Sequence, residues 1–134
     1  MPAYLADTSA WHRSDQVAER WSDLIERDGL LLCTPVRLEL LYSARGADYE
    51  RLARGLDGFR QLALDAQAEV AAMRIQESLA EKSQHRGPSV TDLLIAAIAA
   101  THEVTLLHYD RHFDAIVRVT GQPAEWLAKR GSLD

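Results

Sequence analysis

The sequence lacks several features that would assign it to a particular class of protein. It has one cysteine, Cys33, which excludes an internal disulfide and favours a reducing compartment. Its longest apolar run, residues 93–100, is far too short to span a membrane, and the N-terminus resembles no signal peptide. Because no repeat, low-complexity tract or linker interrupts it, we expect residues 1–134 to form a single cytoplasmic domain.

An excess of positive charge is also missing. The chain has 15 Lys and Arg residues against 20 Asp and Glu residues, which gives a formal net charge of −5. Bulk electrostatics therefore do not indicate a nucleic-acid-binding protein. A substrate that contains phosphate would need local basic residues or bound cations.

Short apolar runs alternate with helical patterns along the chain. Strands are predicted at 4–6, 30–33, 104–107 and 124–127, and residues 59–64 fit either a strand or the start of a helix. Helices are predicted at 17–28, from Thr34-Pro35 to near Gly46, at 47–58, at 65–84, from Ser89 to Ala100, and after Asp110. This alternation predicts an α/β fold, a three-layer sandwich around a mainly parallel sheet with right-handed crossovers.

Two of the predicted helices have a distinct apolar face. One face combines Val17, Trp21, Leu24 and Ile25, and the other combines Leu93, Ala96, Ala97 and Ala100. We expect both faces to be buried, and the alanines allow the second helix to lie close to its neighbours.

Acidic residues follow two of the strands and open two of the helices. In a parallel sheet, sites lie at the carboxyl ends of the strands, where Asp7 follows the first strand and Asp110 follows residues 104–108. Asp92 and Glu39 lie early in helices that could face this edge. Four carboxylates in one place would repel each other unless a cation neutralised them. Mg²⁺ and Mn²⁺ prefer such oxygen ligands and promote in-line displacement at phosphorus, so the pattern indicates phosphodiester hydrolysis.

The order of these motifs resembles the PIN domain and, more closely, the VapC-type toxins of bacterial toxin–antitoxin pairs. The motifs are Asp7-Thr8-Ser9, Thr34-Pro35 followed by Glu39, Asp92 ahead of Leu94-Ile95-Ala96-Ala97, and Tyr109-Asp110-x-x-Phe113. The resemblance implies a Mg²⁺- or Mn²⁺-dependent endoribonuclease that acts on RNA and forms a homodimer. It also implies a cognate antitoxin, whose C-terminal segment covers the active site.

The resemblance assigns roles residue by residue. The acidic quartet of the family, which binds the metal and is catalytic, matches Asp7, Glu39, Asp92 and Asp110. Ser9 matches a small polar residue that supports the first acid, and we expect Thr8 to help orient Asp7 as well. Asp114 matches an additional acid that part of the family has. His108 departs from the pattern, because many members have a hydroxyl residue two positions before the fourth acid.

Simpler interpretations of the same residues remain open. Asp7 and Asp110 could be N-caps, Asp92 could complement a helix dipole, and Glu39 could be a solvated helical residue. The motif His108-x-Asp110-x-His112 could suggest zinc, but structural zinc sites use four nitrogen or sulfur ligands and the single cysteine is far away in sequence.

Two other functional classes also remain open. A receiver-like phosphoacceptor domain would need paired acids after the first strand and a late lysine, whereas the only lysines are Lys82 and Lys129. A non-catalytic PIN-like interaction module would be expected to lack part of the quartet.

Contacts with RNA and with the antitoxin are predicted from residues outside the quartet. Arg13, Arg86 and Arg111 flank the acids in sequence and could contact the RNA backbone. An apolar docking surface for the antitoxin is expected on residues 10–28 and 35–44, with Trp11, Trp21 and Tyr42 as anchors.

Overall fold

Five short strands form one parallel sheet in the computed structural model, which describes residues 2–134. The strands are β1 (Tyr4–Ala6), β2 (Leu30–Cys33), β3 (Arg60–Leu62), β4 (Thr105–His108) and β5 (Ala124–Trp126). Their order is β3-β2-β1-β4-β5, and every neighbouring pair is parallel. The four predicted strands are confirmed to within one residue at their ends, and the ambiguous segment 59–64 contains the strand β3.

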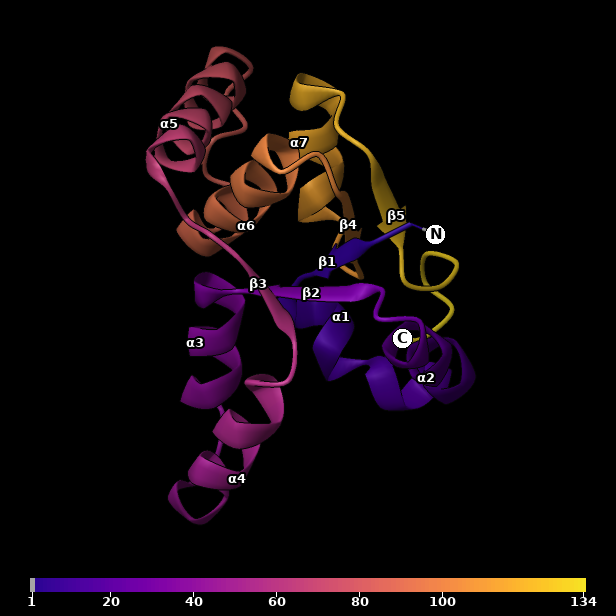
Figure 1. The fold of residues 1–134 in the computed structure, drawn as a ribbon. Coiled ribbons are helices and arrows are strands. Elements are labelled where there is room, and N and C mark those ends of the chain that lie inside the picture. The colour runs from indigo at the N-terminus through magenta and orange to yellow at the C-terminus, as the bar shows by residue number, and fades with distance from the viewer. Residues whose placement is uncertain (1) are drawn as a thin grey trace.

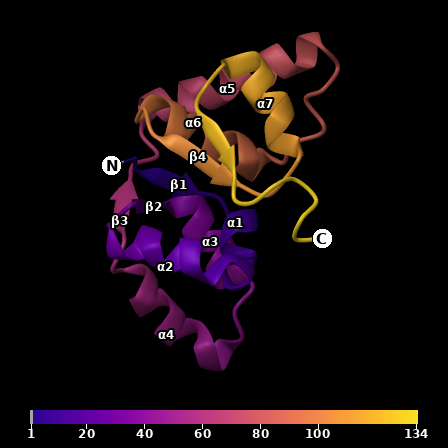
Figure 2. The same ribbon diagram turned by 90° about the vertical axis from the view of Figure 1, so that its right-hand side faces the viewer.

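Helices cover both faces of the sheet (Figure 1). They are α1 (Thr8–His12), the 3₁₀ helix η1 (Ser14–Val17), α2 (Ala18–Glu26), α3 (Thr34–Tyr42), α4 (Gly46–Leu56), α5 (Ala66–Glu81), α6 (Val90–Thr101) and α7 (His112–Thr120). Helices α1 to α4 lie on one side, and α5 to α7 lie on the other, as a view turned by 90° also shows (Figure 2). The predicted three-layer α/β sandwich is therefore confirmed.

The order of the strands creates a switch point between β1 and β4. After β1 the chain builds the sheet outward through β2 and β3, and it then crosses to the opposite face and returns to pair β4 with β1. The connections from β1 and β4 thus leave in opposite directions, which opens a crevice at the carboxyl ends of these two strands. Asp7 directly follows β1, and Asp110 lies two residues beyond the end of β4.

Helix α6 is buried over most of its circumference. It packs against α3, α5, α7 and β4, and its residues Leu93, Ile95, Ala96, Ala97, Ile98 and Ala99 are all buried. Ala100, which the sequence pattern places on the buried face, is only half-buried. Although α6 is apolar all round, no helix within residues 2–134 has both the length and the hydropathy to cross a membrane.

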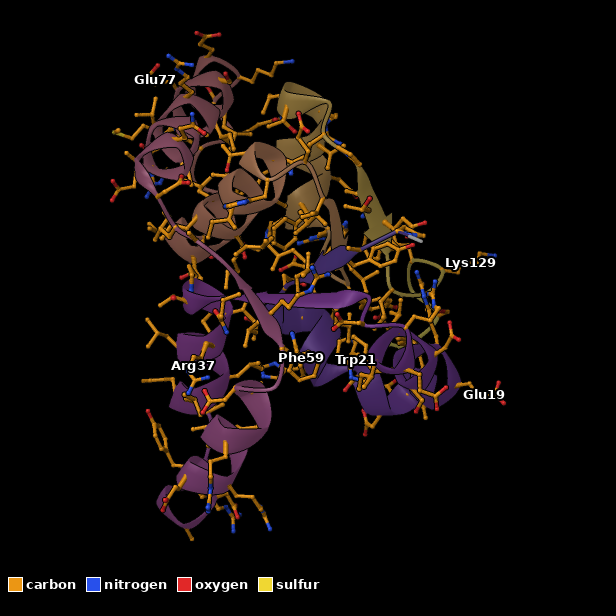
Figure 3. The ribbon with its side chains drawn as sticks, viewed as in Figure 1. Glu19, Trp21, Arg37, Phe59, Glu77 and Lys129 are labelled. Carbon is orange, nitrogen blue, oxygen red and sulfur yellow. The ribbon has the colours of Figure 1, made fainter. Side chains whose placement is uncertain are left out.

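The segment predicted as one helix at 17–28 differs from the prediction. Only residues 18–26 of it form the helix α2, whereas Val17 is the last residue of η1, and Asp28, beyond the end of α2, takes a positive φ of 54°. Trp21 and Leu24 are buried as expected, whereas Ile25 is 47% exposed. Trp21 and Phe59 lie on the helical layer below the sheet (Figure 3), and Trp11 packs edge-on against both rings at 5.0 and 5.2 Å.

The boundary between α3 and α4 also differs from the prediction. Helix α3 begins at Thr34, and Cys33 holds the N-cap position without a side-chain hydrogen bond. Helix α3 ends at Tyr42, well before Gly46, and Gly46 begins α4. Proline near the start of α3 is confirmed, since Pro35 needs no backbone N–H there.

Two glycines provide a test of the backbone conformation. Gly121 ends α7 at a φ of +68°, and a Cβ there would meet no atom within 4 Å, so Gly121→Ala should cost about 1 kcal/mol through backbone strain alone. Gly55 lies inside α4 with the same free space and no positive φ, so Gly55→Ala should stabilise by about 0.5–1 kcal/mol. Urea denaturation of both variants measures these values, and changes of the same sign would contradict the assigned conformations.

Candidate active site

The four acids of the predicted quartet line one cleft at the carboxyl edge of the sheet. Asp7, Glu39, Asp92 and Asp110 surround a space of about 580 Å³. The remaining lining residues are Thr8, Ser9, His12, Arg13, Arg86, Gly87, Pro88, Ser89 and His112. The structure therefore brings together acids from four separate segments of the chain. It also adds His12, for which the sequence pattern gives no signal.

Asp7 is the most buried of these acids, with only 3% of its surface exposed. Its Oδ1 accepts a hydrogen bond from the backbone N–H of Ala10, so Asp7 is indeed the N-cap of α1. Burial raises its pKa to about 7, in spite of hydrogen bonds from Ser9 and Ala10 that favour the charged form, and the charge of Asp92 adds to the rise. A cap at the surface would not experience this desolvation. Asp7 is therefore both a cap and a carboxylate that needs a counter-charge.

Ser9 connects the ends of the neighbouring strands β1 and β4. Its hydroxyl donates to Asp7 Oδ1 at 2.7 Å and accepts the backbone N–H of Tyr109 at 2.8 Å. The backbone N–H of Asp7 also donates to Leu107 O at 2.9 Å. Ser9 thus orients Asp7 against the end of β4, in keeping with the supporting role predicted for it.

Thr8 has a different partner from the one predicted. Its hydroxyl donates to Glu39 Oε1 at 2.5 Å and not to Asp7. Thr8 and Ser9 are consecutive residues of α1, so their side chains point in different directions, and Thr8 faces α3. The pair therefore holds two different acids, with Ser9 on Asp7 and Thr8 on Glu39.

Asp92 lies in the first turn of α6 within a capping box. The Ser89 hydroxyl accepts the N–H of Asp92 at 3.1 Å, and Asp92 Oδ2 accepts the N–H of Ser89 at 3.0 Å. Partial burial raises the pKa of Asp92, and the charges of Asp110 and Glu39 add to this rise. A residue that only complemented a helix dipole would not lie in a field of other carboxylates.

Asp110 is held by contacts on both sides in sequence. Its N–H donates to Nδ1 of His108 at 3.2 Å, and its Oδ1 accepts the N–H of His112 at 2.9 Å. The N-cap residue of α7 is Arg111, so Asp110 is not the N-cap that the simpler interpretation suggests. Possible metal-binding atoms of Asp92, Asp110 and His112 lie within 4.8 Å of one another.

Asp114 lies outside this cleft. Its Oδ2 pairs with Arg130 Nη1 at 2.9 Å on the neighbouring surface. It can influence the site only at a distance, because its charge is already compensated.

The donor atoms fit a hard divalent cation. Within residues 2–134, the only ion-pair partner of any of the four carboxylates is His112, whose Nδ1 lies 3.2 Å from Asp110 Oδ1. The buried Asp7 therefore has no basic side chain to balance it. Carboxylate oxygens suit Mg²⁺ or Mn²⁺ better than an imidazole does. Within residues 2–134, only Asp92 and Asp110, together with His112, bring candidate donor atoms within 4.8 Å of one another, and Asp7 and Glu39 line the same cleft beside this group.

A zinc site on His108, Asp110 and His112 is not supported. His108 is 1% exposed, and its Nδ1 already accepts the N–H of Asp110. Cys33 is buried at the end of β2, where burial raises the pKa of its thiol to about 11. Neither Cys33 nor His108 belongs to the one group of candidate metal ligands within residues 2–134, which contains a single imidazole, whereas structural zinc sites use four nitrogen or sulfur ligands.

Comparison with known proteins agrees with this geometry. Residues 4–119 match the PIN domain family. Ribonuclease VapC18 of Mycobacterium tuberculosis is 40% identical over 97% of this chain and 98% of its own length. Ribonuclease VapC51 of the same organism is 39% identical over 98% and 97%. The chain therefore belongs to the PIN domain family, and within it to the VapC ribonucleases.

Solved structures show the same fold at lower identity. DNA-bound VapBC from Salmonella typhimurium superimposes with a TM-score of 0.74 and 22% identity, over 96% of this chain and 100% of that chain. VapBC-1 from nontypeable Haemophilus influenzae gives a TM-score of 0.73 and 21% identity, over 95% and 99%. At this identity, the likeness supports the fold and leaves the receiver-like alternative without support.

The burial of Asp7 predicts a pH-dependent stability. Its pKa of about 7 lies above the ordinary value of 3.8, so the folded state holds more protons between these values and loses stability as the pH rises through that range. Asp7→Asn removes this loss and keeps the cap. In EDTA, the variant should gain about 1–3 kcal/mol over the wild type at about pH 8 and much less at about pH 4.

Asp65→Asn is the matched control, measured by the same thermal unfolding series. Asp65 caps α5 through an equivalent bond to the N–H of Ala68, but its side chain is exposed. Its substitution should give no gain that grows with pH. Equal behaviour of the two variants would show that Asp7 is an ordinary cap.

Proposed function

We infer that this protein is a PIN-domain endoribonuclease of the VapC type, the toxin of a toxin–antitoxin pair. One observation carries this conclusion: the whole acidic quartet lines a single cleft at the switch point of the sheet. The chain also matches proteins named VapC ribonucleases over nearly its full length. A non-catalytic module would be expected to have a gap in the quartet, and this chain has none.

The proposed cofactor is Mg²⁺ or Mn²⁺. Asp7 and Asp92 are proposed as its main ligands, and Glu39 and Asp110 would complete the acidic cradle directly or through water. When bound, such a cation would activate water and stabilise the charge that develops at phosphorus. It would also relieve the desolvation of Asp7 and the repulsion among the carboxylates.

The residues of the chain itself would position the reacting groups. Ser9 and Thr8 hold Asp7 and Glu39 in fixed orientations, which limits the reorganisation needed when the substrate arrives. The RNA backbone would lie across the cleft with the scissile phosphate at the four acids. Hydrolysis would then proceed by in-line attack of water, without a covalent intermediate on the protein.

An antitoxin is the proposed protein partner, and its segment would cover the cleft. The named neighbours VapBC are consistent with such a pair. Leu38 and Tyr42 of α3 are 61% and 91% exposed and line an apolar groove that also contains Thr8 and Glu39. Trp21 cannot serve as the predicted anchor, because it is buried beneath Trp11 in the helical layer. The docking surface is therefore proposed on α3, with Tyr42 as its most exposed anchor.

A homodimer in the cytoplasm is also proposed. Val70 and Met73 of α5 are 42% and 58% exposed on the opposite face of the sheet, where a second copy could cover them. The unpaired Cys33 suits a reducing compartment, in which a toxin would meet cellular RNA.

Metal-dependent cleavage tests the proposed activity. The purified protein should cleave total RNA in Mg²⁺ or Mn²⁺ and lose this activity in EDTA. Asp92→Asn should reduce cleavage by orders of magnitude and remove the rise in melting temperature that the cation gives to the wild type. The capping box should survive, since Ser89 remains the N-cap and an amide oxygen at position 92 can still accept the N–H of Ser89.

Glu77→Gln is the control for this loss of one charge. Glu77 is exposed on α5, far from the cleft (Figure 3), and its substitution should leave cleavage unchanged. Full activity in EDTA, or near-wild-type cleavage by Asp92→Asn, would overturn the proposed site.

Expression in bacteria tests the toxin and its partner. The wild type should arrest growth, and a small protein encoded beside it should restore growth. Tyr42→Ser should still arrest growth but should be rescued poorly, because it loses an exposed docking anchor without touching the acids. Asp92→Asn, expressed to the same level, should not arrest growth. Unaffected growth with abundant soluble wild-type protein would favour the non-catalytic interpretation.

A further inference from the structure

A second, more basic pocket adjoins the acidic cleft. It encloses about 470 Å³, and its walls include Arg13, Arg111 and Arg130 with the aromatic side chains of Tyr109 and Trp126. Ser9, Arg13 and Asp110 line both this pocket and the cleft, so the two spaces are continuous. The C-terminal tail leaves β5 at this same edge of the sheet (Figure 2) and forms the outer wall. A strand of nucleic acid that lies on the acids could therefore extend into the pocket.

Arg13 is the central feature of this pocket. Its guanidinium carbon lies 4.8 Å above the centre of the Tyr109 ring. Its Nε is buried and has no hydrogen-bond partner, and Arg13 makes no ion pair with any of residues 2–134. A buried donor on a charged group is costly unless an acceptor satisfies it. The Nε itself is out of reach of a ligand, but the Arg13 side chain lines the pocket and its charge has no carboxylate partner within residues 2–134, so an anionic ligand in the pocket would balance that charge.

The other two arginines complete the basic wall. Arg111 is exposed and also lacks an ion-pair partner within the described part of the chain. Arg130 pairs with Asp114 at 2.9 Å, and its guanidinium carbon lies 5.4 Å from the centre of the Trp126 ring. Arg130 is thus fixed in place, whereas the charges of Arg13 and Arg111 are free to meet a ligand.

The platform beneath Arg13 is rigid. Tyr109 is 6% exposed, its hydroxyl accepts the N–H of Leu133 at 2.8 Å, and its own N–H donates to Ser9 Oγ. The same serine orients Asp7. The position of Arg13 is therefore tied to that of the acids through Tyr109 and Ser9.

We propose that this pocket binds a phosphate group of the RNA strand, next to the phosphate that is cleaved. The inference rests on the proposed ribonuclease function and names the residues that hold its substrate, Arg13 and Arg111. A planar guanidinium can donate two parallel hydrogen bonds to the oxygens of one phosphate. Base stacking is disfavoured, because Arg13 and Arg130 already lie over the faces of Tyr109 and Trp126.

The charge of the acidic cleft explains why such a pocket is needed. Four carboxylates repel a polyanion, and the chain as a whole carries a net charge of −5. A bound cation can compensate only at the scissile phosphate. Local arginines beside the acids would hold the neighbouring phosphate and fix the register of the strand.

Binding of a short fluorescein-labelled RNA of random sequence, measured by anisotropy in EDTA, tests the proposal. Arg13→Gln and Arg111→Gln should each weaken binding by about tenfold, the effect of one charge-assisted hydrogen bond. Each should also lower the slope of log Kd against log salt concentration by about 0.7, because one phosphate contact is lost. Arg13→Lys keeps the charge but not the planar fork and should fall between wild type and Arg13→Gln.

Two further variants test whether the change in RNA affinity depends on the sign of the charge removed and on its position in the pocket. Arg74 is exposed on α5, on another face, and Arg74→Gln should leave both affinity and slope unchanged. Asp134 lines the pocket, and Asp134→Asn removes a repulsive charge, so it should strengthen binding. In all variants the rise in melting temperature with Mg²⁺ or Mn²⁺ should match the wild type, because the acids are intact.

The outcomes separate this inference from the proposed function. If the wild type binds and cleaves RNA while Arg13→Gln and Arg111→Gln match it in affinity and salt slope, the pocket does not hold the substrate. If these variants lose only the antitoxin and not RNA, the pocket serves a protein partner and the proposal is overturned. If the wild type itself neither binds nor cleaves RNA, the proposed ribonuclease function is wrong, and the proposal for the pocket falls with it.

Discussion

The desolvated carboxylate of Asp7 is the constraint on which the site depends. Burial at the end of β1 raises its pKa to about 7, and three hydrogen-bonding or charged neighbours act on it with opposing signs. Ser9 and the N–H of Ala10 favour the ionised form, whereas Asp92 opposes it. No basic side chain of residues 2–134 forms an ion pair with this carboxylate. The fold therefore holds a carboxylate in a position that is favourable only when a cation is present, at the cost of some stability without one.

The strand order makes this arrangement possible and extends it beyond the acids. Because β1 and β4 are neighbours, Ser9 at the start of α1 reaches the N–H of Tyr109 beyond β4, and one hydroxyl aligns two strand ends. Tyr109 then supports Arg13 on the far side of the same junction. Acids for the scissile phosphate and arginines for its neighbour thus share one rigid framework. A change at Ser9 would disturb both, which links metal binding and substrate binding in a single short segment.

Much of this arrangement could be predicted from the sequence, and the failures have physical reasons. Asp7 and Asp110 follow buried strands, and carboxyl ends of parallel strands meet at one edge, so their proximity follows from topology. The partner of Thr8 could not be predicted, because Glu39 approaches from a different segment and the direction of α1 decides which hydroxyl faces it. The ends of the helices are harder to predict than their existence. Asp28, two residues beyond the end of α2, takes a positive φ that Gly29 alone does not reveal. Arg130 reaches the basic pocket only because β5 lies beside β4, which the local pattern cannot indicate.

His108 shows how a departure from the family pattern can preserve the site. Its ring is packed against Phe113 and Trp126 at centroid distances of 5.1 and 4.9 Å, and burial lowers its pKa, so the imidazole is neutral. A neutral ring has one nitrogen free to accept, and Nδ1 accepts the N–H of Asp110. The two consecutive N–H groups beyond β4 are thus satisfied by side chains, that of Tyr109 by Ser9 and that of Asp110 by His108. A hydroxyl at position 108 could accept the same bond, so the substitution changes the acceptor atom while the backbone that carries Asp110 keeps its support.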